Sequence, residues 1–91
     1  MLANVEISKG NVSCDNCFKI CVKDNTLVMN YISGAIKNSF NIPISEMTNL
    51  TTAHWFGSQQ IDFSYQNLKF EFIENGYGEI DYLKKNLCQS V

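Results

Sequence analysis

The sequence predicts a mainly β domain of the α+β class, with a small curved antiparallel sheet or partly open barrel of about seven strands and one C-terminal helix. Apolar and polar side chains alternate with a period of two through most of the 91 residues. Short polar turns separate the alternating runs, and a helical period replaces this alternation only at about residues 77–88. Six Phe, four Tyr and many aliphatic residues are enough for one core, so residues 1–91 are expected to form a single domain.

The first half of the chain predicts four strands. Phe18, Ile20 and Val22 share one face of their strand, and the polar turn Lys23–Asn25 joins this strand to the next in a hairpin. Because proline has no backbone N–H, Pro43 places the last of the four at an edge of the sheet. The predicted strands are Asn4–Lys9, Cys17–Lys23 with its lead-in Val12–Asn16, Thr26–Ile32 and Lys37–Ile44.

The second half predicts three strands and then the helix. Leu50–Phe56 ends at Gly57–Ser58, and Gln66–Asn67 turns a second hairpin. The apolar positions of this hairpin are Ile61, Phe63, Tyr65, Leu68, Phe70 and Phe72. The apolar stripe of the helix is formed by Tyr77, Ile80, Leu83 and Leu87. We expect this stripe to cover the open end or one face of the sheet.

Several segments between about Val12 and Leu87 carry a resemblance to a known family. They are a hairpin with a polar turn, a strand that leads into an isoleucine–proline–hydrophobic–x–glutamate link, and an aromatic–glycine turn before a second hairpin. In this sequence they are Phe18–Ile20 with Leu27–Met29, Phe40–Met47, His54–Gly57, and Ile61–Phe63 with Lys69–Phe72. The order of elements resembles the pleckstrin-homology-like (PH-like) superfold, in particular the small PH-like and GRAM-like domains of bacteria.

This resemblance implies a scaffold that binds lipid head groups, peptides or other protein domains, and it does not specify one ligand. Members that bind phosphoinositides carry Lys and Arg in the first hairpin, whereas Ser13–Lys19 holds one lysine and one aspartate. Each basic residue near an anionic surface contributes about 1 kcal/mol, and the dispersed lysines of this chain offer no cluster in which this energy could accumulate. Membrane lipid is therefore not an expected ligand.

The charge of the chain also argues against a nucleic-acid partner. All seven basic residues are lysines, arginine is missing, and the formal net charge is −2. Arginine makes most bidentate contacts to phosphate and guanine, so no nucleic-acid interface is expected. No run approaches the ~18–20 apolar residues that span a bilayer, and Met1–Glu6 lacks the pattern of a secretion signal, so a cytoplasmic location is expected.

The cysteines allow an alternative interpretation. Cys14 and Cys17 have a spacing that zinc sites use, and Cys88 is a third candidate ligand for a small metal-binding regulatory protein. Cys17 and Cys21 lie roughly 13 Å apart in an extended strand, too far for one metal ion or a disulfide. Free reduced thiols are the favoured interpretation. The carboxylates near the helix start, Glu71, Glu74, Glu79 and Asp81, are interpreted as helix-end charges on a solvated face.

Catalysis is not expected, because His54 is the only histidine and no spacing pairs it with a nucleophile. No cofactor is expected either. Trp55 and Phe56 precede Gly57 on opposite faces of one strand, so at least one of these rings is expected to be exposed and available to a partner. The edge strand with Phe40 and Ile42 could pair with an extended peptide. The sequence therefore predicts a non-enzymatic protein-binding, peptide-binding or assembly module, with self-association left open.

Overall fold

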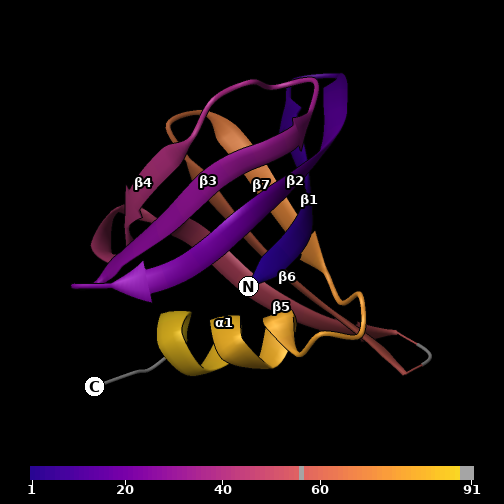
Figure 1. The fold of residues 1–91 in the computed structure, drawn as a ribbon, viewed down its shortest axis with the longest axis vertical. Helices are drawn as coiled ribbons and strands as arrows, with labels where there is room; N and C mark the ends of the chain where they lie inside the picture. The colour runs from indigo at the N-terminus through magenta and orange to yellow at the C-terminus, as the bar shows by residue number, and fades with distance from the viewer. Residues whose placement is uncertain (56, 89–91) are drawn as a thin grey trace.

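The computed structural model describes residues 1–55 and 57–88, and at Trp55 it describes only the backbone. Its single antiparallel sheet has the strand order β4-β3-β2-β1-β7-β6-β5 and curls into a half-barrel (Figure 1). The elements are β1 (Leu2–Lys9), β2 (Val12–Lys23), β3 (Thr26–Gly34), β4 (Phe40–Pro43), the 3-10 turn η1 (Ile44–Glu46), β5 (Thr48–Trp55), β6 (Ser58–Tyr65), β7 (Leu68–Ile73) and α1 (Glu79–Leu87). The predicted fold class is confirmed.

Both predicted hairpins are present, and their turns explain their register. Asp24 and Asn25 join β2 to β3, and Gln66 and Asn67 join β6 to β7. All four residues have positive φ angles between 50° and 66°, as two-residue turns that match the twist of antiparallel strands require. Asn is among the residues that tolerate this backbone best, so the polar turn residues fix which strand residues face each other.

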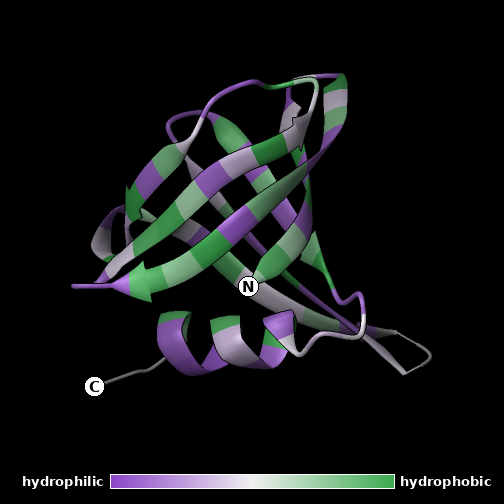
Figure 2. Ribbon diagram, in the orientation of Figure 1, coloured by the Kyte–Doolittle hydropathy of each residue, from purple (hydrophilic) through white to green (hydrophobic). Residues whose placement is uncertain are grey.

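The core fills the inner side of the half-barrel. Figure 2 shows hydrophobic and hydrophilic residues alternating along the strands, and the hydrophobic residues of α1 turned toward the sheet. The rings of Phe63 and Phe70 stack with centroids 5.0 Å apart, and Phe72 adds a third ring to this group. The buried hydrophobic residues are Ala3, Val5, Ile7, Phe18, Ile20, Leu27, Met29, Ile42, Ile61, Phe63, Phe70, Phe72, Ile80, Leu83 and Leu87.

The predicted strand Lys37–Ile44 is shortened at both ends, to Phe40–Pro43. The buried amide of Asn16 explains the late start, because its Nδ2 donates to the Ile36 carbonyl at 2.7 Å and its Oδ1 accepts the Ile36 N–H at 3.4 Å. A Cβ on Gly34 would lie 2.6 Å from the Asn16 side chain, so this contact requires glycine. After Pro43 the chain turns into η1.

The predicted helix start at Tyr77 is wrong, because α1 begins at Glu79 and Tyr77 is 71% exposed. Gly76 and Gly78 have φ angles of 92° and 79°, a left-handed backbone that no helix can continue through. The other three residues of the predicted stripe, Ile80, Leu83 and Leu87, are buried as expected.

The helix is tied to the end of β2 by one side chain. The N–H of Ile20 donates to the Met1 carbonyl at 2.7 Å, where β1 begins. Two residues further along β2, the Val22 N–H donates to the hydroxyl of Tyr82 at 2.7 Å. The helix therefore supplies the acceptor for a strand N–H that β1 does not reach. No helix among the described residues is long and apolar enough to cross a membrane.

Candidate binding site

Four carboxylates line up across four neighbouring strands on the outer face of the sheet. Asp15 of β2 lies opposite Glu6 of β1, Glu6 lies opposite Glu71 of β7, and Glu71 lies opposite Asp62 of β6. Directly opposite residues in antiparallel strands have Cβ atoms about 4.5–5.5 Å apart, and like charges at this distance destabilise the sheet. We call Asp15, Glu6, Glu71 and Asp62 the acidic row.

Neighbouring side chains compensate only one end of the acidic row. Lys69 Nζ lies 3.5 Å from Glu71 Oε1, the one ion pair found in residues 1–55 and 57–88. Gln60 Nε2 donates to Asp62 Oδ1 at 2.7 Å and to Glu71 Oε2 at 3.3 Å. Among the described side chains, Glu6 and Asp15 have no ion-pair partner within 4.0 Å.

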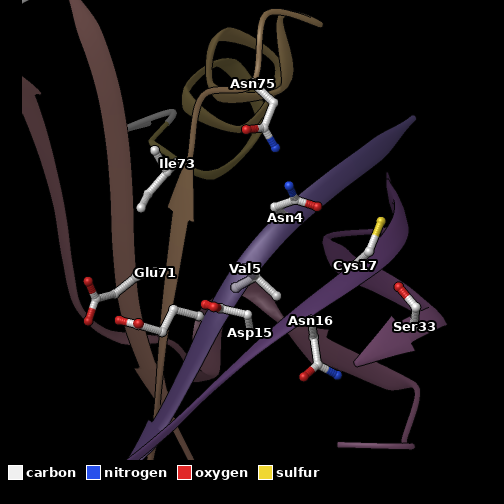
Figure 3. A pocket seen from close by; sticks show the side chains of 10 residues that line it. Asn4, Val5, Asp15, Asn16, Cys17, Ser33, Glu71, Ile73 and Asn75 are labelled. Atoms are coloured by element: carbon white, nitrogen blue, oxygen red, sulfur yellow. The ribbon is translucent and has the colours of Figure 1, made fainter. Parts of the chain in front are cut away.

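A groove of about 450 Å³ lies over β1 and between β2 and β7, and Glu6, Asp15 and Glu71 of the acidic row help to line it. Figure 3 shows Glu71 and Asp15 at one end of this groove and Asn4, Cys17 and Asn75 toward the other. We call it the outer groove. It is open to solvent and lined by polar and charged side chains together with Ile73, so it suits an extended segment better than a small enclosed ligand.

Exposed apolar side chains lie beside the end of the outer groove that is away from the acidic row. Leu2, Ile73 and Tyr77 are large apolar side chains that are 50%, 45% and 71% exposed. Leu2 and Tyr77 line a second hollow that shares Asn4, Cys17 and Asn75 with the outer groove. One continuous surface therefore passes from exposed apolar side chains to aligned carboxylates. Exposed apolar groups beside a polar rim are typical of contact surfaces between proteins.

Two other carboxylates hold the segment that leads into α1. Glu74 accepts the N–H groups of Gly76 (2.7 Å), Gly78 (3.1 Å) and Ile80 (3.2 Å). Glu79 accepts those of Asn75 (3.2 Å) and Tyr77 (3.1 Å). We call Glu74 and Glu79 the helix-start carboxylates.

The prediction of a solvated face is wrong for Glu79, which is fully buried. The pKa of Glu74 reflects its surroundings. Burial acts to raise this pKa, but the adjacent Glu79 side chain and the backbone N–H groups of Ile80, Gly78 and Gly76 outweigh burial and lower the pKa below its ordinary value. Glu74 therefore favours the charged form, which is the form that accepts hydrogen bonds from the loop.

The predicted peptide-pairing strand does lie at an edge of the sheet, as Pro43 indicated. The side chains of Phe40 and Ile42 point inward: Ile42 is fully buried, and the Phe40 ring packs between those of Phe18 and Phe70, with centroids 5.9 and 5.3 Å away. These two side chains belong to the core, so β4 presents its backbone and the exposed Asn41 side chain at the edge. A role for β4 in binding stays a prediction.

The structure does not test the predicted contact residues at the end of β5. Phe56 and the side chain of Trp55 lie outside the described residues. His54 is exposed on β5, which forms the second edge of the sheet.

The cysteines are not brought together. Cys14 and Cys17 are three positions apart on β2, in the stretch that pairs regularly with β1, so their side chains lie on opposite faces of the sheet. Cys88 follows the last residue of α1. Within residues 1–55 and 57–88, no group of three or more His, Cys, Asp or Glu side chains could hold a metal ion.

Comparison with family models, curated proteins and solved structures finds no match for this chain. The sequence did not indicate the acidic row, because each carboxylate is simply a polar residue on its own strand. A signal was present: Glu6, Asp15, Asp62 and Glu71 all occupy the positions of their strands that face away from the core. Only the register between strands places them in one line.

Proposed function

We propose that this protein is a non-enzymatic binding module with a PH-like fold, and that its outer groove holds a segment of a partner protein. The acidic row carries this proposal. Like charges aligned across four strands destabilise the free protein, and a cationic partner would convert that repulsion into attraction. A half-barrel with a C-terminal helix and the element order of PH-like domains supports the fold assignment.

The outer groove and the hollow beside it suggest the chemistry of the partner. The acidic row suits Lys or Arg side chains, and the exposed side chains of Leu2, Ile73 and Tyr77 suit an apolar residue. An extended segment that places an apolar residue before or after basic residues would contact the acidic row and the apolar side chains at once. The same carboxylates repel phosphate, which supports a protein partner over nucleic acid or anionic lipid. Sedimentation with phosphoinositide vesicles should therefore leave the protein in the supernatant.

The partner chemistry can be tested by selecting binders from a randomised peptide library. We expect the wild-type protein to select peptides that combine Lys or Arg with an apolar residue. A triple variant, Glu6→Gln with Asp15→Asn and Glu71→Gln, keeps the side-chain shapes and removes three charges of the acidic row. Selection on this variant should lose the enrichment in basic residues.

A matched control is Glu46→Gln, which removes one exposed carboxylate on η1, outside the acidic row. It should leave the selection unchanged. The amide shifts that a selected peptide produces in the wild-type protein should centre on Asn4, Cys17 and Ile73. Peptides without basic residues, or shifts confined to other faces of the sheet, would contradict the proposed binding mode.

A further inference from the structure

The two edge strands of the sheet, β4 and β5, differ in how they are protected against pairing with a further strand. A free edge exposes backbone N–H and C=O groups that pair readily with another strand, and proteins commonly shorten such edges or place Pro or Lys in them. β4 has four residues and contains Pro43. β5 has eight residues, Thr48–Trp55, without proline, lysine or an acidic residue. Its register with β6 shifts between Thr48 and Thr51, so only the stretch Thr51–Trp55 pairs regularly and offers a regular free edge.

Hydrogen bonds elsewhere in the sheet show which backbone groups of β5 are free. The Glu74 N–H donates to the Gln59 carbonyl at 3.0 Å, so the backbone of Gln59 points from β6 toward β7. Because backbone groups alternate between the two sides of a strand, Gln60, opposite Ala53, points toward β5. It follows that Thr52 and His54, in the regularly paired stretch of β5, have backbone groups that face the outer edge. Leu50, which precedes Thr51 next to the register shift, continues the same alternation.

The same reasoning shows that β4 offers little at its outer edge. The Ile44 N–H donates to the Asn25 carbonyl at 2.9 Å, so the backbone groups of Ile44 point toward β3. Because backbone groups alternate along a strand, those of Ile42 point toward β3 as well. The backbone groups at the outer edge therefore belong to Asn41 and Pro43, and Pro43 has no N–H. Strand addition is favoured at β5 and disfavoured at β4.

We propose that β5 pairs antiparallel with β5 of a second copy of this chain, around a two-fold axis at Thr52. Thr52 then lies opposite Thr52 of the second copy, and Leu50 lies opposite His54 in both directions. Each pair joins residues whose backbone groups face outward, and no like charges meet. This register also keeps Asn49, whose φ angle is 54°, outside the paired segment.

The two-fold axis of such a pair stands perpendicular to the joined sheet. Both outer grooves would therefore open on the same side of the assembly. The surface that forms the pair is the β5 edge, and the outer groove takes no part in it. Self-pairing through β5 and partner binding in the outer groove therefore use separate surfaces, and either one can fail without the other.

The test measures the oligomeric state of the full chain by sedimentation equilibrium, from about 10 µM to about 1 mM protein. We expect a concentration-dependent dimer, because strand pairing alone buries little surface. The Thr52 N–H faces the outer edge and is unbonded in the monomer, so Thr52→Pro removes no hydrogen bond there. In the dimer, the same substitution in both copies removes two hydrogen bonds. It should raise the dissociation constant of the dimer roughly 10- to 100-fold. Asn41→Pro makes the same change at the outer edge of β4 and should leave the dimer unchanged.

A charge exchange tests the register and does not depend on the proline variant folding. Thr52→Lys and Thr52→Glu should each weaken self-association, since like charges then face each other at the axis. An equimolar mixture of the two variants should restore the dimer, whereas Asn41→Lys mixed with Asn41→Glu should behave like the wild type. A monomeric wild-type protein across the whole range, or a mixture no more dimeric than its components, would overturn the proposal.

Discussion

Individual hydrogen bonds fasten α1 and the segment before β4 to the sheet. Tyr82 binds α1 to β2 through its hydroxyl, and Asn16 binds the segment before β4 through its amide. Neither contact has a signature in the sequence, because a half-buried Tyr on a helix and an Asn in a strand are ordinary residues. Both depend on an acceptor or donor that is distant along the chain.

Replacing Tyr82 with Phe should lower the free energy of unfolding by about 1 kcal/mol, because the partly buried Val22 N–H loses its acceptor. Urea denaturation measures this change. Tyr77→Phe removes a hydroxyl from a side chain that is 71% exposed and should have almost no effect. Equal effects of the two substitutions would contradict the role given to Tyr82.

Phe72 should be among the most sensitive core positions. It is fully buried beside Phe63, with ring centroids 5.9 Å apart. Phe72→Ala should cost about 3–5 kcal/mol, a large part of the stability of a domain of this size. Lys69→Ala, on the same strand, should cost well under 1 kcal/mol, because the side chain is 53% exposed and its ion pair is screened by water. Thermal or urea unfolding of both variants checks the contrast.

At the scale of elements, the sequence predicted strands well wherever one face alternates without interruption. Phe18–Val22 and the hairpin that contains Phe70 and Phe72 are confirmed, because burial of every second residue is itself what holds a strand in place. The helix start was missed for a specific reason. Tyr77 has the spacing of the stripe, but periodicity does not detect the left-handed backbone of Gly76 and Gly78.

The helix start should respond to acid through Glu74. Its pKa in the folded state lies below the ordinary value of 4.5, so the charged carboxylate stabilises the fold. This contribution is present above the pKa of the unfolded chain and is lost as the pH falls through the lower pKa of the folded state. The free energy of unfolding should therefore decrease below about pH 4.5, as urea unfolding at a series of pH values would show.

A variant separates this effect from general acid unfolding. Glu74→Gln cannot ionise, and its amide can accept fewer of the N–H groups of Gly76, Gly78 and Ile80. It should be less stable than the wild type by about 1–2 kcal/mol at neutral pH, by analogy with the loss of a helix cap. Its stability should also fall less steeply in acid. An identical acid profile for the two proteins would refute the assignment to Glu74.

At the scale of the whole molecule, the candidate site depends on the register of strands that are far apart in the sequence. Glu6 and Glu71 become neighbours only because β1 pairs with β7, a pairing that periodicity alone does not specify. This is why the sequence could predict the fold class and yet miss the acidic row. The predicted contact residues at Trp55 and Phe56, and the predicted peptide pairing along the edge at Phe40 and Ile42, stay predictions.

The acidic row should destabilise the free protein. Glu6→Gln keeps the shape of a side chain that faces two carboxylates, Asp15 and Glu71, and removes its charge. The free energy of unfolding should rise by about 0.2–1 kcal/mol at low salt, with a smaller gain at high salt because ions screen the repulsion. Glu46→Gln, outside the row, should change little. A loss of stability on Glu6→Gln would contradict the assumed repulsion.

The place of β1 in the middle of the sheet affects when the sheet can be completed during synthesis. β1 is the first strand made, yet one of its two neighbours, β7, is the last. Until β7 leaves the ribosome, the strands β1 to β4 present an open edge at β1 and an inner face that lacks Phe63, Phe70 and Phe72. The two halves of the sheet share one core, so the nascent chain is expected to stay incompletely folded until β7 has left the ribosome.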